Sequence, residues 1–431
     1  MAEPLVDLKA HFLSPQPRSA WVRRQVRLFN SRLTPAGRLE KFKEMSQSPF
    51  VFFRGTDHLF WSDFGETKLP RHFGGKKGTR IWICGDMHCG NFGAFTDSQD
   101  RLVYDINDFD ESVIADYQFD LWRLAISLVL LGKQNQLKPH HVKSLVQGFA
   151  KGYFHEIESC HDDGGACEKV LDHRNATGIL KQFLHHTRRI YGKKKMLERW
   201  TEEIQGDLRF KVKANPDLEA IPAGLAPLLR DALEEYADHL KPWPLKSLGL
   251  FEVKDLAQRL HQGVGARGLN RYYALLKVEA GPKEKYRILD IKLQPKPSPW
   301  AFLPSKAKEK TKEACDGDHG LRTALAFQAL GQAVDPWLGW LKLEDGEYSV
   351  RERSPYKAVL AFNQMDAGLS RQLGEILARA HCRAKKKFAL KAWDRLKEKE
   401  APFAQALQVI AHAYADQVEL DYQSFISAPL R

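Results

Sequence analysis

The feature that most constrains this chain is a pair of polar segments, each of which follows a short apolar run. The first is GDMHCGN at residues 85–91, and the second is NDFDE at residues 107–111. The runs before them, 79–84 and 101–106, have the apolar character of short β-strands. We therefore expect the carboxylates of both segments on loops at one edge of the strands.

The residue types in these segments suit phosphate transfer. An aspartate such as Asp86 accepts the proton of an attacking hydroxyl, while Asn91 and Asp108 are placed to hold Mg²⁺ against nucleotide phosphates. Mg²⁺ requires oxygen ligands of this kind. We also expect His88 among the catalytic residues and Asp110 among the metal ligands. Either segment alone is usually a turn with solvated acids, so it is their combination and order that favour catalysis.

A glycine-rich segment with a lysine beyond it lies far downstream. Gly263, Gly265 and Gly268 fit the pattern G-x-G-x-x-G, and a strand-like run follows where a dinucleotide-binding fold would need a helix. A second strand-like run ends at Lys292. Because glycine lets phosphates approach the backbone and a lysine ammonium neutralises them, we expect a nucleotide here. A solvated strand lysine is the alternative for Lys292 in so basic a chain.

More strand patterns follow this lysine. Runs 336–343 and 348–353 flank a turn at Asp345-Gly346, and a helical pattern spans 319–333. With the strands around the glycine segment they predict a five-stranded antiparallel sheet and one helix. The sequence leaves the polar partner of the lysine open among Glu309, Glu313 and Gln328.

The motifs resemble those of the aminoglycoside and choline kinase type of small-molecule phosphotransferase. Those enzymes carry a Gly-Asp-x-His-x-x-Asn loop, here 85–91, and an Ile-Asp-Phe-Asp-like strand end, here around Asp108. The resemblance continues through 116–124 and implies that Asp120 caps a helix and braces the catalytic loop. Cys84 departs from the pattern, because kinases usually have a histidine there.

As a whole, the chain is identified as similar to a bacterial domain-of-unknown-function family of kinase-like proteins, over about residues 20 to 425. Its other marks are SPFVFFRG at 48–55, Lys292 and LARAH at 377–381. The resemblance implies an α+β, protein-kinase-like fold of two lobes with a site for ATP and Mg²⁺, and it implies no known substrate. Arg54 is a candidate cation for binding phosphate or for bracing a loop.

The order of these parts predicts a circular permutation. We expect a helical catalytic lobe at 1–245, a nucleotide-binding β lobe at 246–355, and a helical segment at 356–431 that returns to the catalytic lobe. LGEILARAH at 373–381 resembles the helix that normally precedes the catalytic loop in small-molecule kinases. Chain ends that lie close together make such a rearrangement tolerable. This helix should therefore pack on the part that carries Asp86.

Composition limits the size of the core, the cellular compartment and the binding partners that we expect. The chain has 431 residues, 43% of them hydrophobic, which is enough to bury two cores. No secretory signal and no apolar stretch long enough to span a bilayer is visible. Six cysteines without a disulfide framework favour a reducing cytoplasm. A net charge of +12 indicates solvated helix faces or an anionic substrate, and nucleic acid is unlikely because no aromatic-interleaved motif accompanies the basic runs.

Two classes of function follow. The preferred one is an ATP- and Mg²⁺-dependent phosphotransferase that acts on a hydroxyl of an unidentified small or anionic substrate; transfer of AMP by the same metal ligands stays open. The other is a nucleotide-binding pseudokinase or scaffold. Presence of Asp86, Asn91, Asp108 and Lys292 together favours chemistry, whereas Cys84 and the undetermined lysine partner favour the scaffold. The sequence does not predict the oligomeric state.

Overall fold

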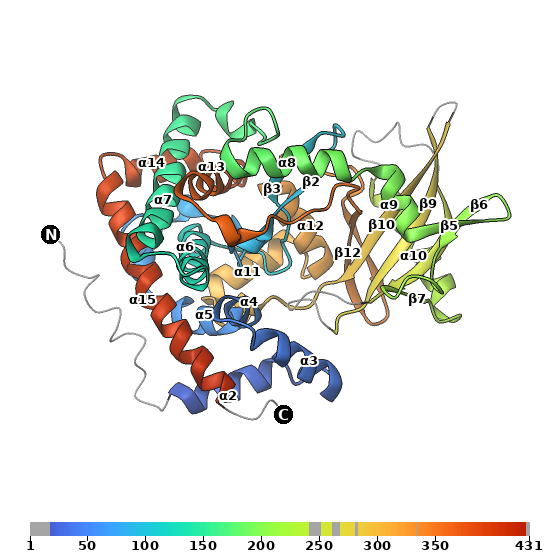
Figure 1. Cartoon of the computed structure of the whole chain (residues 1–431), viewed down its shortest axis with the longest axis horizontal. Coiled ribbons are helices and arrows are strands. Elements are labelled where there is room, and N and C mark those ends of the chain that lie inside the picture. The colour runs from blue at the N-terminus through green and yellow to red at the C-terminus, as the bar shows by residue number, and fades with distance from the viewer. Residues whose placement is uncertain (1–17, 241–250, 261–267, 281–282, 333, 428–431) are drawn as a thin grey trace.

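The protein is a mixed α+β structure in which one antiparallel sheet adjoins a larger helical part (Figure 1). The computed structural model describes residues 18–240, 251–260, 268–280, 283–332 and 334–427. None of the helices in these ranges is both long enough and apolar enough to cross a membrane.

The sheet has six strands in the described ranges, and not the five that we expected. The additional strand is β7, which has only three residues and pairs with β8 from Leu218 opposite Arg259 to Ala220 opposite Ala257. Three residues are too few to show the alternation by which a strand is recognised in sequence. In spatial order the strands are β11 (Gly339–Leu343), β12 (Gly346–Glu352), β10 (Lys283–Leu293), β9 (Arg271–Ala280), β8 (Phe251–Arg259) and β7 (Leu218–Ala220).

Each face of the sheet is covered by a separate cluster of apolar side chains. Leu289 and Ile291 pack with α10 (Leu225–Leu240) on one face, while Ile288 packs with Trp200, at the end of α9 (Lys193–Trp200), on the other. Because successive side chains of a strand alternate between faces, Asp290 and Lys292 share the face of Ile288. At this end of β10, Lys292 and the following Gln294 contact Asp110, in the loop at residues 107–112.

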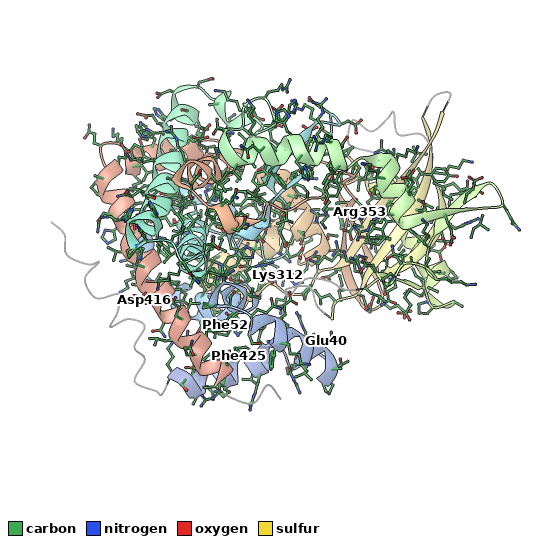
Figure 2. The ribbon with its side chains drawn as sticks, in the orientation of Figure 1. Glu40, Phe52, Lys312, Arg353, Asp416 and Phe425 are labelled. Atoms are coloured by element: carbon green, nitrogen blue, oxygen red, sulfur yellow. The ribbon has the colours of Figure 1, made fainter. Side chains whose placement is uncertain are left out.

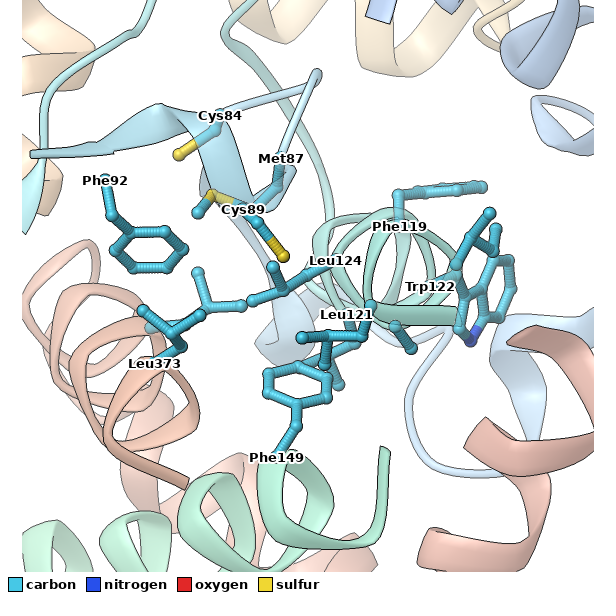
Figure 3. Close-up of a cluster of buried hydrophobic side chains, with 14 of the residues drawn as sticks. Cys84, Met87, Cys89, Phe92, Phe119, Leu121, Trp122, Leu124, Phe149 and Leu373 are labelled. Atoms are coloured by element: carbon cyan, nitrogen blue, oxygen red, sulfur yellow. The ribbon is translucent and has the colours of Figure 1, made fainter. Parts of the chain in front are cut away.

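The helical part is built around α6 (Gln118–Gln134), which is buried on nearly every side. Helix α7 (Pro139–Asp162) packs on α6 and on α13 (Ala367–Arg383). Leu373 of α13 and Phe149 of α7 lie in the same apolar cluster as Cys84 and Met87 (Figure 3). The expectation that the helix containing residues 373–381, here α13, packs against the part carrying Asp86 is thus confirmed.

The first and last parts of the described chain meet on this helical part, where α15 packs on α2 and α4. Phe52 of α4 and Phe425 of α15 are labelled in Figure 2, and their ring centroids lie 5.3 Å apart. The charged run 306–312 lies in a helix, α11. The remaining helices are α2 (Arg18–Phe29), α3 (Pro35–Met45), α4 (Pro49–Gly55), α5 (Asp57–Phe64), α8 (Gly178–Ile190), α11 (Ser305–Ala314), α12 (His319–Leu330), α14 (Phe388–Leu396) and α15 (Glu400–Ile426).

Short two-stranded ribbons carry the two polar motifs. The strands expected at 79–84 and 101–106 are confirmed as β1 and β3, so that residues 85–91 follow β1 and residues 107–111 lie between β3 and β4. Strand β1 pairs with β4, and β2 pairs with β3. The ribbons are β1 (Arg80–Ile83) with β4 (Val113–Asp116), β2 (Phe92–Thr96) with β3 (Leu102–Ile106), and β5 (Thr201–Ile204) with β6 (Asp207–Phe210).

Candidate active site

The two polar motifs contact each other through their backbones. Gly85 has φ +80°, and a Cβ atom there would lie 2.1 Å from the carbonyl oxygen of Glu111, so only glycine fits this approach. The backbone N–H of Asn107 donates to the carbonyl oxygen of Asn91 at 2.9 Å. The side-chain amide of Asn91 donates to the carbonyl oxygen of Asp86 at 2.6 Å. We refer to residues 84–91, which the sequence predicts to carry catalysis, as the catalytic loop, and to residues 107–112 as the acidic loop.

Asp120 of α6 holds the start of the catalytic loop by hydrogen bonds to its backbone. The carboxylate of this fully buried residue accepts hydrogen bonds from the N–H groups of Cys84, at 2.8 Å, and Gly85, at 3.0 Å. His381 of α13 lies 3.4 Å from the same carboxylate through its Nε2 atom. The expected bracing role of Asp120 is confirmed. Its expected capping role is wrong, because Asp120 lies inside the first turn of α6 and Tyr117 occupies the cap position.

Apolar side chains hold the same loop from inside. Met87, Cys89 and Phe92 point into the core with Leu121 and Leu124 of α6 (Figure 3). Each of these five side chains is inaccessible to solvent. The backbone of the catalytic loop is therefore fixed before any ligand binds, which is the rigidity that positioned catalytic groups require.

Asp86 lies at the end of a buried chain of charges. Arg123 of α6 bonds the carboxylate of Asp86 through Nη2, and its Nη1 lies 2.9 Å from Asp57. The guanidinium of Arg123 is fully buried and stacks over the ring of Phe53 at 4.2 Å. Burial raises the pKa of Asp86 to about 7, against the opposing effect of Arg123, and neighbouring carboxylates add to the rise. The side chain keeps 17% of its surface exposed, so it remains accessible to a substrate.

His88 adjoins Asp86 as a neutral ring. Arg54 donates from Nε to Nε2 of His88 at 3.3 Å, which makes this ring nitrogen an acceptor. Burial and the nearby cations Arg54 and Arg123 lower the pKa of His88 well below its usual range. The same Nε2 lies 3.8 Å from Asp86. Of the two roles expected for Arg54, the contact with His88 corresponds to loop bracing.

The sheet reaches the acidic loop through Lys292. The ammonium of Lys292 bonds Asp110, and the amide of Gln294 donates to the other oxygen of Asp110 at 2.9 Å. Burial alone would raise the pKa of Asp110, but Lys292 and Gln294 offset that and lower it to about 2. Asp110 is therefore the partner that the sequence left open among Glu309, Glu313 and Gln328. Asp108 lies two residues away and is exposed, and partial enclosure by the protein and Asp110 raise the pKa of its carboxyl.

Helix α12 holds the backbone of the acidic loop. Its fully buried Arg322 donates from Nη1 to the carbonyl oxygen of Ser112, at 2.8 Å, and from Nη2 to that of Asp110, at 2.7 Å. Phe327 stacks on Phe109 of the loop with ring centroids 4.6 Å apart. Sequence reasoning missed Arg322 and Arg123. The available signal was an arginine within an apolar helical run, because a protein core buries an arginine only when carboxylate or carbonyl groups pair with it.

A family model described as an uncharacterized protein conserved in bacteria (DUF2252) matches residues 34–428. The chain belongs to this family. The matched range contains both loops, the sheet and α13. No curated protein and no solved structure matches the chain.

The oxygen donors of this DUF2252 chain have the chemistry that Mg²⁺ requires. Asn91 and Asp108 supply amide and carboxylate oxygens. Burial, and after it the carboxylate of Asp110, raises the pKa of Asp108, an effect that a bound cation would oppose. In the described ranges, no group of three or more His, Cys, Asp or Glu side chains is placed to hold a metal ion. Asp110 bonds Lys292 instead. The donors thus fit Mg²⁺ in kind, while their arrangement here does not close a complete metal site.

The glycine-rich segment of the DUF2252 chain is only partly described. Gly268 lies just before β9 with φ +80°, and a Cβ atom there would lie 2.4 Å from the side chain of Leu33. Gly263 and Gly265, which we also expected to approach a nucleotide, lie outside the described residues.

Proposed function

We propose that the protein is an ATP- and Mg²⁺-dependent phosphotransferase that acts on a hydroxyl of an unidentified small or anionic substrate. The observation that carries this proposal is the meeting of Lys292 with Asp110, across 182 residues of sequence, beside the loop that carries Asp86. A phosphate-binding lysine, metal-ligating oxygens and a proton acceptor are the parts that phosphoryl transfer needs in one place. Three separate segments of the chain supply them.

Each residue has a role in this proposal. Lys292 would bind the nucleotide phosphates, and Asn91 and Asp108 would hold Mg²⁺, which neutralises phosphate charge when bound. Asp86 would accept the proton of the attacking hydroxyl, and Arg123 would orient its carboxylate. Asp110 would hold Lys292 in position, and its expected role as a metal ligand requires that Lys292 first move to the phosphates.

The proposal includes a protein-kinase-like, two-lobed fold in permuted order. The six-stranded sheet would be the nucleotide lobe, and α13 would supply His381 to brace the catalytic loop from the C-terminal side of the sequence. The contact of His381 with Asp120 supports this, because it gives the loop a buried histidine where Cys84 departs from the kinase pattern. We propose the cytoplasm as the setting, since all six cysteines are free thiols.

Calorimetric titration of ATP with Mg²⁺ separates the two aspartates. Asp108→Ala should abolish Mg²⁺-dependent binding, because the phosphates would then face an incomplete metal site. Asp86→Ala should keep binding and lose turnover by at least ~10²-fold, the usual contribution of a general base. Asp394→Ala is the matched control, because it removes an exposed carboxylate of α14. Unchanged Mg²⁺-dependent binding in Asp108→Ala would defeat the assignment.

The product assay uses ATP labelled separately in its γ- and α-phosphates against a panel of hydroxyl compounds. Label that moves only from the γ position identifies phosphoryl transfer, whereas label that moves from the α position identifies AMP transfer. Loss of either signal in Asp86→Ala ties the chemistry to the catalytic loop.

A nucleotide-binding scaffold is the second candidate, and one observation favours it. Asp86 and Lys292 are each already neutralised by a partner within the chain, Arg123 and Asp110. A scaffold would bind ATP without releasing either pair. Wild-type protein that binds ATP with Mg²⁺ but transfers neither label across the panel would support this candidate.

A further inference from the structure

A cavity of about 130 Å³ lies between the β2–β3 turn and the segment that follows β12. Asn107, Arg351, Arg353 and Lys357 are among the residues that line it. Arg353 is labelled in Figure 2, where β12 meets the helical part. A protein cavity of ~150 Å³ accepts a molecule the size of benzene, so this one suits a single small group. A whole nucleotide requires a larger pocket.

Three cations of the lining, Lys357, Arg351 and Arg353, have no ion pair with a carboxylate among the described residues. The ammonium of Lys357 makes no hydrogen bond or ion pair with the described part of the chain, although solvent reaches it. Enclosure by the protein, together with Arg271 and Arg351, lowers the pKa of Lys357 to about 7. Arg351 donates to the neutral carbonyl oxygen of Asn107 at 3.0 Å. Arg353 stacks over Trp200 at 4.7 Å, and its buried Nε has no hydrogen-bond partner among the described residues.

Four of the five carboxylates that line the cavity are already occupied, and the fifth, Asp100, is exposed on the β2–β3 turn. Asp290 faces Lys357 and Arg351 from β10, but Arg271 bonds both of its oxygens. Asp335 uses its two oxygens to accept the backbone N–H groups of Trp337 and Glu352. Two further carboxylates of the lining have arginine partners: Asp97 with Arg101, and Glu352 with Arg287. The positive charge of Lys357 and Arg351 is therefore left for an external anion to neutralise.

We propose that this cavity binds a phosphate-type anion through Lys357 and Arg351. Arginine and lysine are the side chains that bind phosphate in proteins, arginine by its paired N–H groups and lysine as a point charge. Cations held close together in a cavity repel one another and destabilise a fold, and a bound anion would relieve that repulsion. The anion would lie beside Asn107 and hence beside the acidic loop, as a phosphate group of a substrate or as a free phosphate ion. Binding can be measured without nucleotide, so this proposal does not depend on the phosphotransferase.

The test measures the affinity of inorganic phosphate and of glycerol 3-phosphate for the full chain by calorimetry and by thermal unfolding. Potassium chloride at matched ionic strength is the control for general screening by salt, and glycerol is the control for binding of the organic part of glycerol 3-phosphate. Phosphate should raise the unfolding temperature of the wild type beyond the chloride value. Lys357→Met should bind phosphate about tenfold more weakly, the loss expected for one charged hydrogen bond, and Lys357→Arg should keep binding.

Lys386→Met is the control, because it removes an exposed lysine of the turn after α13. It should bind phosphate as the wild type does. Lys357→Met should be at least as stable as the wild type without anion, since it removes a repelled cation, so lost binding cannot be attributed to unfolding. Stronger binding of glycerol 3-phosphate identifies a substrate-borne group, and stronger binding of inorganic phosphate identifies the free ion. Equal phosphate affinity in the wild type and Lys357→Met, or no stabilisation beyond chloride, would overturn the proposal.

Discussion

At the scale of single residues, we expect Arg123 to contribute strongly to the stability of the fold, because it neutralises two buried carboxylates. It is the buried partner of both Asp57 and Asp86. Arg123→Met keeps much of the volume but leaves Asp57 buried without its counter-charge. Removing one partner of a buried ion pair costs about 3–5 kcal/mol, so urea unfolding should show a loss of this size. Adding Asp57→Asn should restore part of the lost free energy. Unchanged stability in Arg123→Met would show that the buried charges are not coupled as described.

Lys357 gives a prediction for the pH dependence of stability. Enclosure by the folded protein lowers the pKa of Lys357 to about 7, from the 10.5 that is usual for lysine. Between these pH values the folded state binds fewer protons than the unfolded state, so stability rises with pH in this window. Lys357→Met should lack this rise and gain most over the wild type below pH 7, where the repelled ammonium is fully charged. The free energy of urea unfolding from pH 6.5 to 9.5, taken as a difference between the two proteins, measures it. Parallel profiles would contradict the lowered pKa.

The sequence was informative for residues whose chemistry is local. Asp86, Asn91 and Asp108 follow strands in a recognisable spacing, and the structure brings their loops together. Arg123 and Arg322 were not found, because their carbonyl and carboxylate partners come from elements far away in sequence. The partner of Lys292 was sought on a helix, whereas the structure has it on the acidic loop.

At the scale of elements, the contact between α7 and α13 depends on glycine. A Cβ atom at Gly152 would lie 2.1 Å from the carbonyl oxygen of Arg371, and one at Gly374 would lie 2.3 Å from that of Phe149. Gly152→Ala gains at most ~1 kcal/mol in helix propensity, but overpacking costs about 1–3 kcal/mol, and the contact here is with rigid backbone. The variant should be less stable than the wild type in urea.

Gly164→Ala is the control for this contact, because a Cβ atom there would meet nothing within 4 Å. It should leave stability unchanged within about 0.5 kcal/mol, as surface substitutions usually do. If Gly152→Ala proves as stable as Gly164→Ala, the helices do not pack as closely as described, and α13 is not held rigidly behind the catalytic loop.

Elements were predictable where their pattern was long or their ends were marked. The helix expected at 319–333 is present as α12, which begins after Asp318 caps it by accepting from the N–H of Leu321. Helix α11 was not predicted over the charged run 306–312, because most of its residues are lysine or glutamate, yet it forms there and buries Ala307 and Thr311. Two small buried residues on one face give too weak a periodic signal to identify a helix.

At the scale of the whole molecule, the first and last helices of the described chain, α2 and α15, are joined through one residue. Arg18 bonds Asp63 at 2.6 Å and Asp421 at 2.8 Å, so that the N-terminal helix, α5 and α15 share one cation. His381 from α13 reaches Asp120 behind the catalytic loop. The sheet, inserted between these segments, contributes Lys292. No local pattern predicts such meetings; only the packing of α13 on the part that carries Asp86 was expected, from the permuted order that the resemblance to kinases implied.

The central claim, that Lys292 lies against the phosphates of bound ATP, is tested most directly by an acyl-phosphate derivative of ATP. A lysine amine beside the bound phosphates attacks the acyl carbon, an amide forms, and ATP leaves. Mass spectrometry of the digested protein should find the acyl group on Lys292, with excess ATP and Mg²⁺ preventing the modification. Lys342, exposed on β11, should react to the same extent with and without ATP. Modification of Lys292 that ATP does not prevent, or ATP-protected modification only at other lysines, would contradict the account.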